Sequence, residues 1–358
     1  MRTSIFCILA VFFLVGICDE AEAQLNRRSI KRNNKRMSSF KGRKQWFPEQ
    51  NRYNMIGVTL GAMNYYGDLA PSSSMISTDL SLTRPAIGLV YSHRFGPRYA
   101  LTGSFTYGAI RGSDQDSADP DDENAVFRYN RNLSFRNRIK ELAIIASFDL
   151  WPNSATYISR VQWTPYAFAG LAVFHHNPQA KAPDFAVDGV TPLEKGGEWV
   201  DLQPLGTEGQ HASLRESDVN YGAKPYKLIQ LAIPFGVGAR FRLNQLMDFS
   251  VEFGFRYLFT DYLDDVSKNY VDLGVFGDNE LAKALSYRSN ELPGIADQLV
   301  SLPSTVDGHD RVYNVLPGYG HEMVWNKRGG QDDRDIYTMT TFKLTYIYGK
   351  TYNRAKFR

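Results

Sequence analysis

The chain has 358 residues, and its 41 basic and 38 acidic residues leave a formal charge of +3, which implies no particular partner. Aromatic residues make up 13% of the chain, with 21 Tyr and 22 Phe, a content typical of strands and of membrane interfaces. Both cysteines, Cys7 and Cys18, lie at the N-terminus, so disulfides and thiol catalysis are excluded for the chain beyond them.

The N-terminus has the pattern of a secretory signal peptide. Arg2 supplies the positive charge, an apolar segment spans residues 5–18, and Ala21-Glu22-Ala23 offers a cleavage site. The apolar segment is shorter than the roughly 20 residues that a transmembrane helix needs. A lipoprotein beginning at Cys18 is the alternative, but a large residue precedes that cysteine where a small one is normal. We therefore expect residues 1–23 to be removed on export.

Residues 24–52 form a basic arm, which is poor in apolar residues and cannot bury a core. We expect this arm to be disordered in the periplasm, either as a solvated leader or as a segment that docks on an acidic partner or surface. Its candidate docking residues are Arg27, Arg28, Lys31, Arg32, Lys35 and Arg36.

From residue 53 to residue 350 the hydrophobic pattern has the period of two that strands show. Residues 249–259 are the clearest case, with aromatic residues or Val on one face and Ser250, Glu252 and Arg256 on the other. The pattern predicts eight strands, at residues 55–66, 84–95, 99–111, 133–151, 161–175, 229–243, 249–259 and 336–348. Pro234 interrupts one of them, and a β-bulge there would accommodate it.

A soluble β-sandwich would alternate in the same way, but its apolar face would form the core. Here the polar faces carry charges of both signs together with glycines, a mixture that suits the narrow lumen of a small barrel. The predicted lumen charges are Glu141, Asp149, Arg240, Arg242, Glu252, Arg256 and Lys343. The sequence therefore predicts an all-β, antiparallel up-and-down transmembrane barrel of about eight strands, with its aromatic-rich face toward outer-membrane lipid.

Short and long connections alternate between the predicted strands. Short turns are expected near residues 96–97, 152–153 and 244–245, and long loops near residues 68–83, 113–132, 177–225 and 261–334. Outer-membrane barrels have short periplasmic turns and long extracellular loops, so both termini, including the tail at 351–358, are assigned to the periplasm. A short helix is expected within residues 278–290.

No compact enzyme motif or metal-ligand spacing is present in the sequence. The acidic segment at 114–123 fits a solvated loop better than a calcium site, and the acidic group at 261–265 fits a hydrogen-bonded cluster better than a metal site. We therefore expect no catalysis, no cofactor, no small-molecule substrate and no nucleic acid. A barrel enzyme that modifies lipids stays a weaker alternative.

Several segments resemble the PorG-type, DUF6089-like outer-membrane barrels of Bacteroidota, which are linked to type IX secretion and gliding motility. The segments are Tyr65-Tyr66-Gly67-Asp68-Leu69, Arg84-Pro85, Tyr107-Gly108-Ala109-Ile110-Arg111-Gly112-Ser113-Asp114, Arg131-Asn132-Leu133-Ser134-Phe135-Arg136 with Glu141-Leu142, and Asp261-Tyr262-Leu263-Asp264-Asp265-Val266-Ser267 with Tyr270-Val271-Asp272. The resemblance implies a non-catalytic component of the secretion apparatus that contacts a PorK-like lipoprotein and a PorN-like periplasmic ring protein. A stand-alone structural barrel, small porin or adhesin is the alternative.

The same segments suggest a charge pairing at the barrel rim. Arginines follow one predicted long loop and aspartates open another, so the two groups are expected at the same end of the barrel. The proposed pairing joins Arg131, Arg136 and Arg138 to Asp261, Asp264 and Asp265.

Overall fold

The protein is described by a computed structural model that places residues 47, 51–69, 82–123, 125–306, 311–330 and 334–348. Its contacts divide the chain into two units, Met1–Pro48 and Glu49–Arg358. The predicted signal peptide, the docking residues of the basic arm and the tail at 351–358 lie outside the described residues. Within the described part, no helix is long and apolar enough to cross a membrane.

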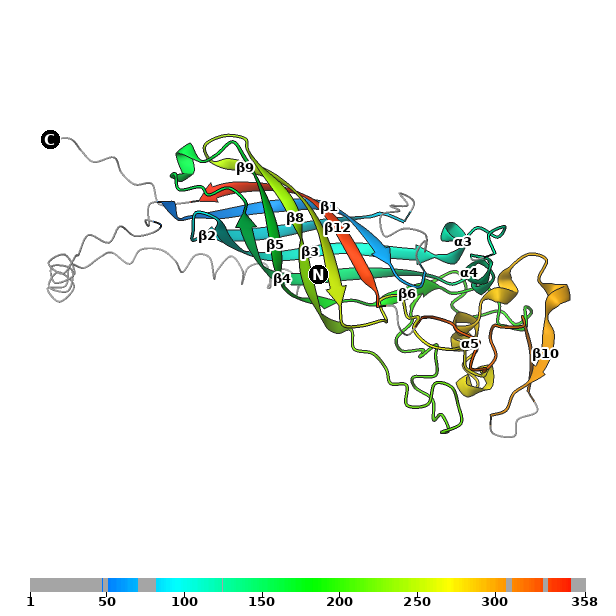
Figure 1. Ribbon diagram of the computed structural model, residues 1–358. Helices are drawn as coiled ribbons and strands as arrows, with labels where there is room; N and C mark the ends of the chain where they lie inside the picture. Colours follow the sequence, from blue (N-terminus) through cyan, green and yellow to red (C-terminus); the bar gives the residue numbers. More distant parts are fainter. Residues whose placement is uncertain are drawn as a thin grey trace, which may run out of the picture. The chain divides into compact units, whose positions relative to one another are not determined.

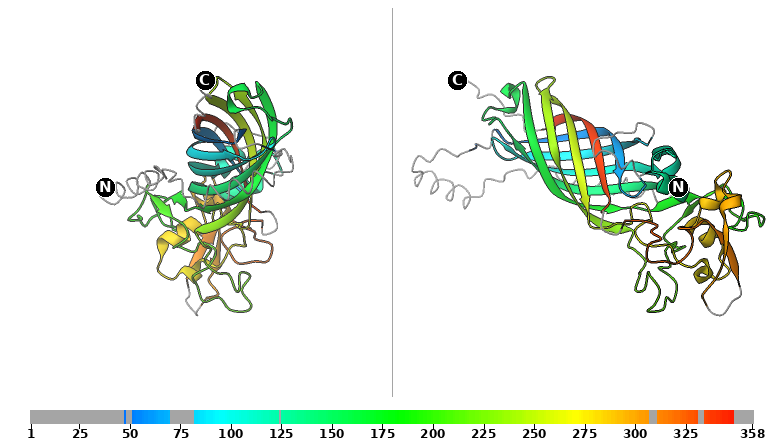
Figure 2. Two further views of the ribbon diagram at one scale, coloured as in Figure 1. Left: turned by 90° about the vertical axis from the view of Figure 1, so that its left-hand side faces the viewer. Right: turned by 45° about the vertical axis from the view of Figure 1, so that its right-hand side comes forward.

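Eight long strands of the described chain form one closed antiparallel barrel, as the sequence predicts (Figures 1 and 2). The ring runs in the order β3-β2-β1-β12-β9-β8-β5-β4 and closes where β3 pairs with β4. The strands are β1 (Tyr53–Tyr66), β2 (Arg84–Arg94), β3 (Tyr99–Ser113), β4 (Ser134–Asp149), β5 (Trp163–His175), β8 (Ile229–Arg242), β9 (Met247–Leu258) and β12 (Ile336–Tyr348).

Between its two ends, the outer surface of the barrel is apolar and exposed. Because successive side chains in a strand point to opposite faces, the alternation sends Leu60, Leu142 and Leu171 outward, where they are 63%, 63% and 70% exposed. An apolar band of this extent around a closed barrel matches a surface that lipid covers. The barrel is therefore of the transmembrane type that the sequence predicts.

Aromatic rings gather at the end of the barrel where the shorter connections lie. Phe95 stacks on Tyr99 with ring centroids 6.1 Å apart, and Tyr99 contacts Phe148 at 5.4 Å. Trp151 and Trp163 meet edge to face at 4.6 Å. All five side chains are exposed, which is the arrangement of an interfacial aromatic girdle.

The connections follow the predicted alternation, with one correction. The β2–β3 turn (95–98) and the β8–β9 turn (243–246) are tight, but the β4–β5 connection runs from 150 to 162 and includes a 3-10 turn, η2 (Tyr157–Ser159). It is longer than expected, and it packs back against the β2–β3 turn, where Asn153 donates its backbone N–H to the Pro97 carbonyl at 2.7 Å.

Pro234 causes no bulge, so that expectation is wrong. The β8–β9 register is the same before and after Pro234, which lies opposite Arg256. On the side of β8 that faces β5, Ala169 pairs with Phe235 and Ala172 pairs with Ala232, so the register is unchanged across Pro234. The two pairs between them are missing. Because proline lacks the backbone N–H donor, β8 loses some backbone pairing to β5 near Pro234 but stays in register with both neighbouring strands.

The long connections fold into a body with its own core at the opposite end of the barrel. We call their described parts, residues 67–69, 82–83, 114–123, 125–133, 176–228, 259–306, 311–330 and 334–335, the cap. Its elements are α3 (Asp114–Ser117), α4 (Val126–Arg131), β6 (Pro178–Lys181), β7 (Trp199–Asp201), η3 (Leu273–Phe276), α5 (Glu280–Ser286), η4 (Ser289–Glu291), η5 (Ala296–Gln298), β10 (Val300–Pro303) and β11 (Val312–Val315). Strand β6 pairs with β4, and β7 pairs with β6.

Helix α5 confirms the short helix expected within residues 278–290. The Asn279 side chain caps it by accepting the Ala282 backbone N–H, which satisfies one of the donors left free at a helix start. Leu285 is buried with Val200 and Leu202, and Ala284 is buried with Tyr270 and Tyr287. The helix therefore ties the 176–228 connection to the 259–335 connection.

Candidate functional site

The barrel lumen holds all seven of the predicted lumen charges, and most of them are ion-paired. Glu141 faces Arg256 at 3.4 Å and also accepts the Tyr337 hydroxyl at 2.6 Å. Glu252 pairs with Lys343. Opposite charges that contact one another out of water are stabilised only in good geometry, so these pairs fill the lumen as a fixed network rather than lining an open channel.

The base of the barrel is sealed by a second group of charges. Asp149 receives Arg94 at 2.7 Å and Arg240 at 3.2 Å, while Arg242 donates to the Arg160 carbonyl at 3.0 Å. Arg160 in turn pairs with Asp248 at 2.6 Å.

The sequence prediction missed Arg94, Arg160 and Asp248. Arg94 is the last residue of β2 and Asp248 is the second residue of β9, so few neighbouring residues on one side show the alternating pattern there. Each nevertheless lies on the inward, polar face of its strand. Arg160 lies in the β4–β5 connection, which has no period to read.

Between these two groups the lumen keeps a small cavity of about 40 Å³. Hydroxyl side chains contribute much of its wall, among them Thr59, Ser104 and Ser250. A cavity of this size has room for a few water molecules and not for a drug-sized ligand, which needs several hundred Å³.

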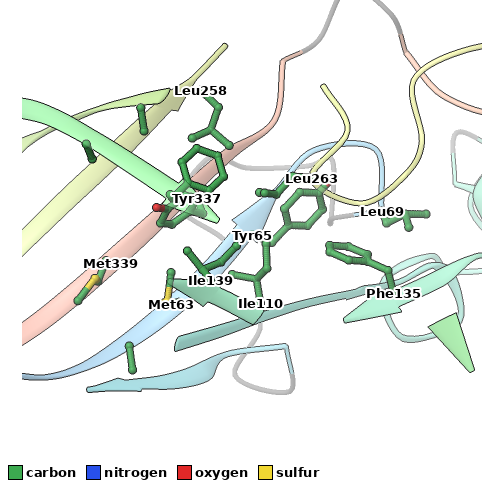
Figure 3. Close-up of a cluster of buried hydrophobic side chains, with 14 of the residues drawn as sticks. Met63, Tyr65, Leu69, Ile110, Phe135, Ile139, Leu258, Leu263, Tyr337 and Met339 are labelled. Atoms are coloured by element: carbon green, nitrogen blue, oxygen red, sulfur yellow. The ribbon is translucent and has the colours of Figure 1, made fainter. Parts of the chain in front are cut away.

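An apolar plug closes the lumen at the cap end (Figure 3). Leu263 and Val266, from the 259–335 connection, are buried among barrel side chains that include Tyr337 and Met63. Leu69 and Phe135 belong to the same cluster, and Tyr65 meets the Phe135 ring edge to face at 4.9 Å. The cap is therefore inserted into the barrel mouth and does not merely rest above it.

The expected rim pairing is wrong for Arg131, whose partner is Asp114. The Arg131 guanidinium binds both Asp114 carboxylate oxygens, at 2.9 and 2.8 Å, and also donates to the main-chain carbonyls of Arg328 and Asp68, each at 2.6 Å. Arg131 is 2% exposed and Asp114 is fully buried, so Asp114 is not the solvated residue expected of its loop. This bidentate pair joins three separate connections of the cap.

Asp265 is also paired differently from the expectation, with Arg328. Arg328 lies 3.1 Å from Glu208 and 3.7 Å from Asp265, and all three side chains are buried. Burial raises the pKa of Asp265 to about 6, although Arg328 opposes the rise. Asp265 has a φ of 71°, a left-handed conformation that aspartate tolerates better than most residues.

The expected pairing of Arg136 and Arg138 with the aspartates at 261–265 is also wrong. The Arg136 guanidinium stacks 3.8 Å from the Trp199 ring and donates to Gln179 at 3.0 Å. Arg138 is exposed on the outer face of β4. The alternation of β4 accounts for both positions, because residues 136 and 138 have the parity of the lipid-facing side.

Asp264 and Asp335 share one phenol. The Tyr65 hydroxyl oxygen lies 2.7 Å from an oxygen of each carboxyl group. A phenol has one proton to donate, so the second short contact requires a proton on one of the two carboxyl groups. Burial raises the pKa of both aspartates well above the ordinary value. The neighbouring carboxylates of Asp335 and Asp68 raise the pKa of Asp264 further, and those of Asp261 and Asp68 raise that of Asp335.

From this shared proton we expect the cap to be sensitive to pH. A carboxyl group whose pKa is raised in the folded state gives its full stabilisation below about pH 4 and loses it as the pH rises through the raised value. We expect Asp335→Asn to stabilise the cap at pH 8 by about 1–3 kcal/mol, because the amide can donate to the Tyr65 oxygen and still accept the Leu263 N–H.

Hydrogen exchange of the cap between pH 5 and pH 9 measures this effect. The native cap should exchange faster as the pH rises, beyond the intrinsic dependence, and the variant should lose most of that slope. The exposed residue Asp121 supplies the control, Asp121→Asn, which should keep the native slope. Equal slopes in both variants would contradict the shared proton.

No curated protein matches the chain. Solved structures similar to it are Neisserial surface protein A (7% identity, covering 82% of this chain and 97% of that one, TM-score 0.33), Ail of Yersinia pestis (7%, 83% and 97%, 0.29) and the outer membrane protein OprG from Pseudomonas aeruginosa (6%, 86% and 100%, 0.35). At these TM-scores the superpositions are too loose to carry a functional argument.

A family model matches part of the chain at the level of sequence. The family is described as a domain of unknown function, DUF6089, and its model matches residues 44–184. The matched residues include β1, β2, β3, β4 and β5. The chain is therefore similar to this family through the first five strands of an outer-membrane type barrel.

Proposed function

We propose that the chain is a non-catalytic, non-conducting barrel of the outer membrane that serves as an anchor for other envelope proteins. The observation that carries this proposal is the filled lumen, which has paired charges at its base and centre and the cap inserted in its mouth. A porin needs a continuous water path, and a lumen with a cavity of about 40 Å³ offers none. The apolar outer face supports placement in a membrane.

The finer proposal is that this anchor belongs to the type IX secretion apparatus. It is supported by the sequence resemblance described above and by the match to the DUF6089 model. The proposed partners are a PorK-like lipoprotein and a PorN-like ring protein on the periplasmic side. The basic arm, with Arg27, Arg28 and Lys31 at its start, is the proposed contact with an acidic partner.

Affinity purification from intact envelopes tests the finer proposal. The full chain should bring down the ring proteins, and deletion of the gene should stop the secretion of cargo proteins. A variant with the basic residues at 27–36 changed to glutamine should insert normally and bring down less ring protein. A chain that purifies without ring proteins, from cells that still secrete, would instead be a stand-alone structural barrel.

Conductance measurements test the coarser proposal. In planar bilayers the purified barrel should produce negligible current, because moving ions through the lumen would require breaking several buried ion pairs at once. An outer-membrane porin recorded in the same bilayers serves as the positive control. Large steady currents from the native chain would contradict a closed lumen.

A further inference from the structure

Basic side chains gather on the outer face of the barrel at its cap end. Arg136, Arg138 and Lys140 occupy alternate positions of β4 and therefore point to the same, outward side. Register places His175 of β5 beside Lys140, and Arg111 of β3 beside Arg136. We call these five residues, Arg111, Arg136, Arg138, Lys140 and His175, the basic ladder.

The basic ladder begins directly above the apolar outer band, at the next outward position of β4 and of β5 toward the cap. The outward row just before Lys140 consists of Phe105, Leu142 and Val173, which are 47%, 63% and 45% exposed. Two residues along a strand span about 7 Å, so Lys140 lies about 7 Å and Arg138 about 14 Å beyond Leu142 along β4. With strands tilted by about 40°, these distances bring both cations to the depth of the lipid headgroups.

Little of this positive charge is neutralised within the chain. Among the described residues, Arg138 and Lys140 have no ion-pair partner within 4 Å, and both are exposed. Arg111 forms an exposed pair with Asp116 at 2.8 Å. Asp201, on the neighbouring β7, is bound by the neutral side chains of Asn177 and Gln179 and adds one negative charge, against the three positive charges of Arg136, Arg138 and Lys140. The ladder therefore keeps an excess of positive charge.

Within the described barrel strands the outward charge at the cap end is concentrated on β3, β4 and β5, while exposed Lys227 and Arg334 lie just beyond the ends of β8 and β12. At the cap ends of the other described barrel strands, the outward positions carry uncharged residues. These are Asn64 and Tyr66 on β1, Pro85 on β2, Ile229 on β8, Tyr257 on β9, and Ile336 and Thr338 on β12. Within the strands themselves, the outward charge at this end is therefore limited to three adjacent strands, over about 14 Å of strand length.

We propose that the basic ladder is a binding site for the phosphate groups of a phosphorylated glycolipid in the membrane leaflet on the cap side. The site rests on the proposed placement of the barrel in the outer membrane. The Arg138 guanidinium offers paired N–H donors to phosphate oxygens, and the Lys140 ammonium offers a point charge. The acyl chains of the same molecule lie against Phe105, Leu142 and Val173, and Trp199 and Tyr107 supply interfacial aromatic surface.

Native mass spectrometry of the full chain in detergent, with diphosphoryl lipid A as the probe, tests the proposal. The Arg138→Gln/Lys140→Gln variant should lose affinity about thirty-fold, from about fivefold for each cation at an anionic membrane surface. Lys195 and Lys224 are exposed residues of the 176–228 connection, so Lys195→Gln/Lys224→Gln removes the same charge elsewhere and should bind as the native chain does. Equal affinity in the ladder variant and this control would overturn the inference.

Two further arms identify the source of the phosphate. Enzymatically dephosphorylated lipid A should bind at the level of phosphatidylethanolamine, and millimolar inorganic phosphate should not displace the intact lipid. Displacement by inorganic phosphate, or undiminished binding after dephosphorylation, would overturn a glycolipid site. Insertion into vesicles, checked by heat-modifiable migration on gels, separates the two levels of the argument. A chain that inserts but ignores lipid A overturns only this inference, and a chain that fails to insert overturns the proposed function.

Discussion

Replacing Arg131 with alanine is expected to release the cap from the barrel mouth while the barrel strands stay folded. The substitution leaves Asp114 as a buried charge without its bidentate partner and removes the donor to the Arg328 and Asp68 carbonyls. Breaking one side of a buried ion pair typically costs about 3–5 kcal/mol. The cap has its own core, so the loss should appear as local opening rather than global unfolding.

Limited proteolysis and hydrogen exchange measure this opening. In Arg131→Ala, amides of the 259–335 connection should exchange about 100-fold faster or more, while amides of β3 and β4 keep native protection. Arg111→Ala is the matched control, because it breaks an exposed Arg–Asp pair in the same region and should cost about 0–1 kcal/mol. If both variants opened the cap equally, burial of the Arg131 pair would not be what holds it.

The cap also shows where sequence reasoning reaches its limit. The barrel could be predicted because a strand repeats every two residues, so the inward positions of Glu141, Glu252 and Arg256 follow from counting. The partner of Arg131 could not be found in this way. Asp114 begins an acidic run whose composition is that of a solvated loop, and only the folding of three connections together buries it.

The wrong rim pairing has the same cause. The prediction brought the arginines and aspartates to the correct end of the barrel but did not separate inward from outward positions at the strand end. Arg136 and Arg138 have the outward parity of β4, whereas Asp264 and Asp265 are buried. Applying the alternation of β4 as far as Ser134 would have separated them. No pattern in the sequence marks Asp335 as the partner of Tyr65, because long connections have no period.

The second large effect is expected at the opposite end of the barrel, from Asp149→Ala. Asp149 is 1% exposed and serves two cations, Arg94 at 2.7 Å and Arg240 at 3.2 Å, so its loss leaves two guanidinium groups at the barrel base without their carboxylate. We expect the unfolding free energy to fall by about 3–5 kcal/mol. Unlike the Arg131 variant, this one should weaken the whole barrel, because β2, β4 and β8 all meet at Asp149.

Urea unfolding in micelles, followed by tryptophan fluorescence, measures this loss, since Trp151 and Trp163 lie beside the barrel base. Asp116→Ala is the control, because it removes the same side chain from an exposed pair and should change stability by less than about 1 kcal/mol. Together, Arg131→Ala and Asp149→Ala distinguish the buried charges that hold the cap from those that hold the barrel base. If Asp149→Ala unfolded like the control, the charges at the base would be solvated through an open lower lumen. The lumen would then be open at the base, and the proposal of a closed, non-conducting barrel would fail at that end.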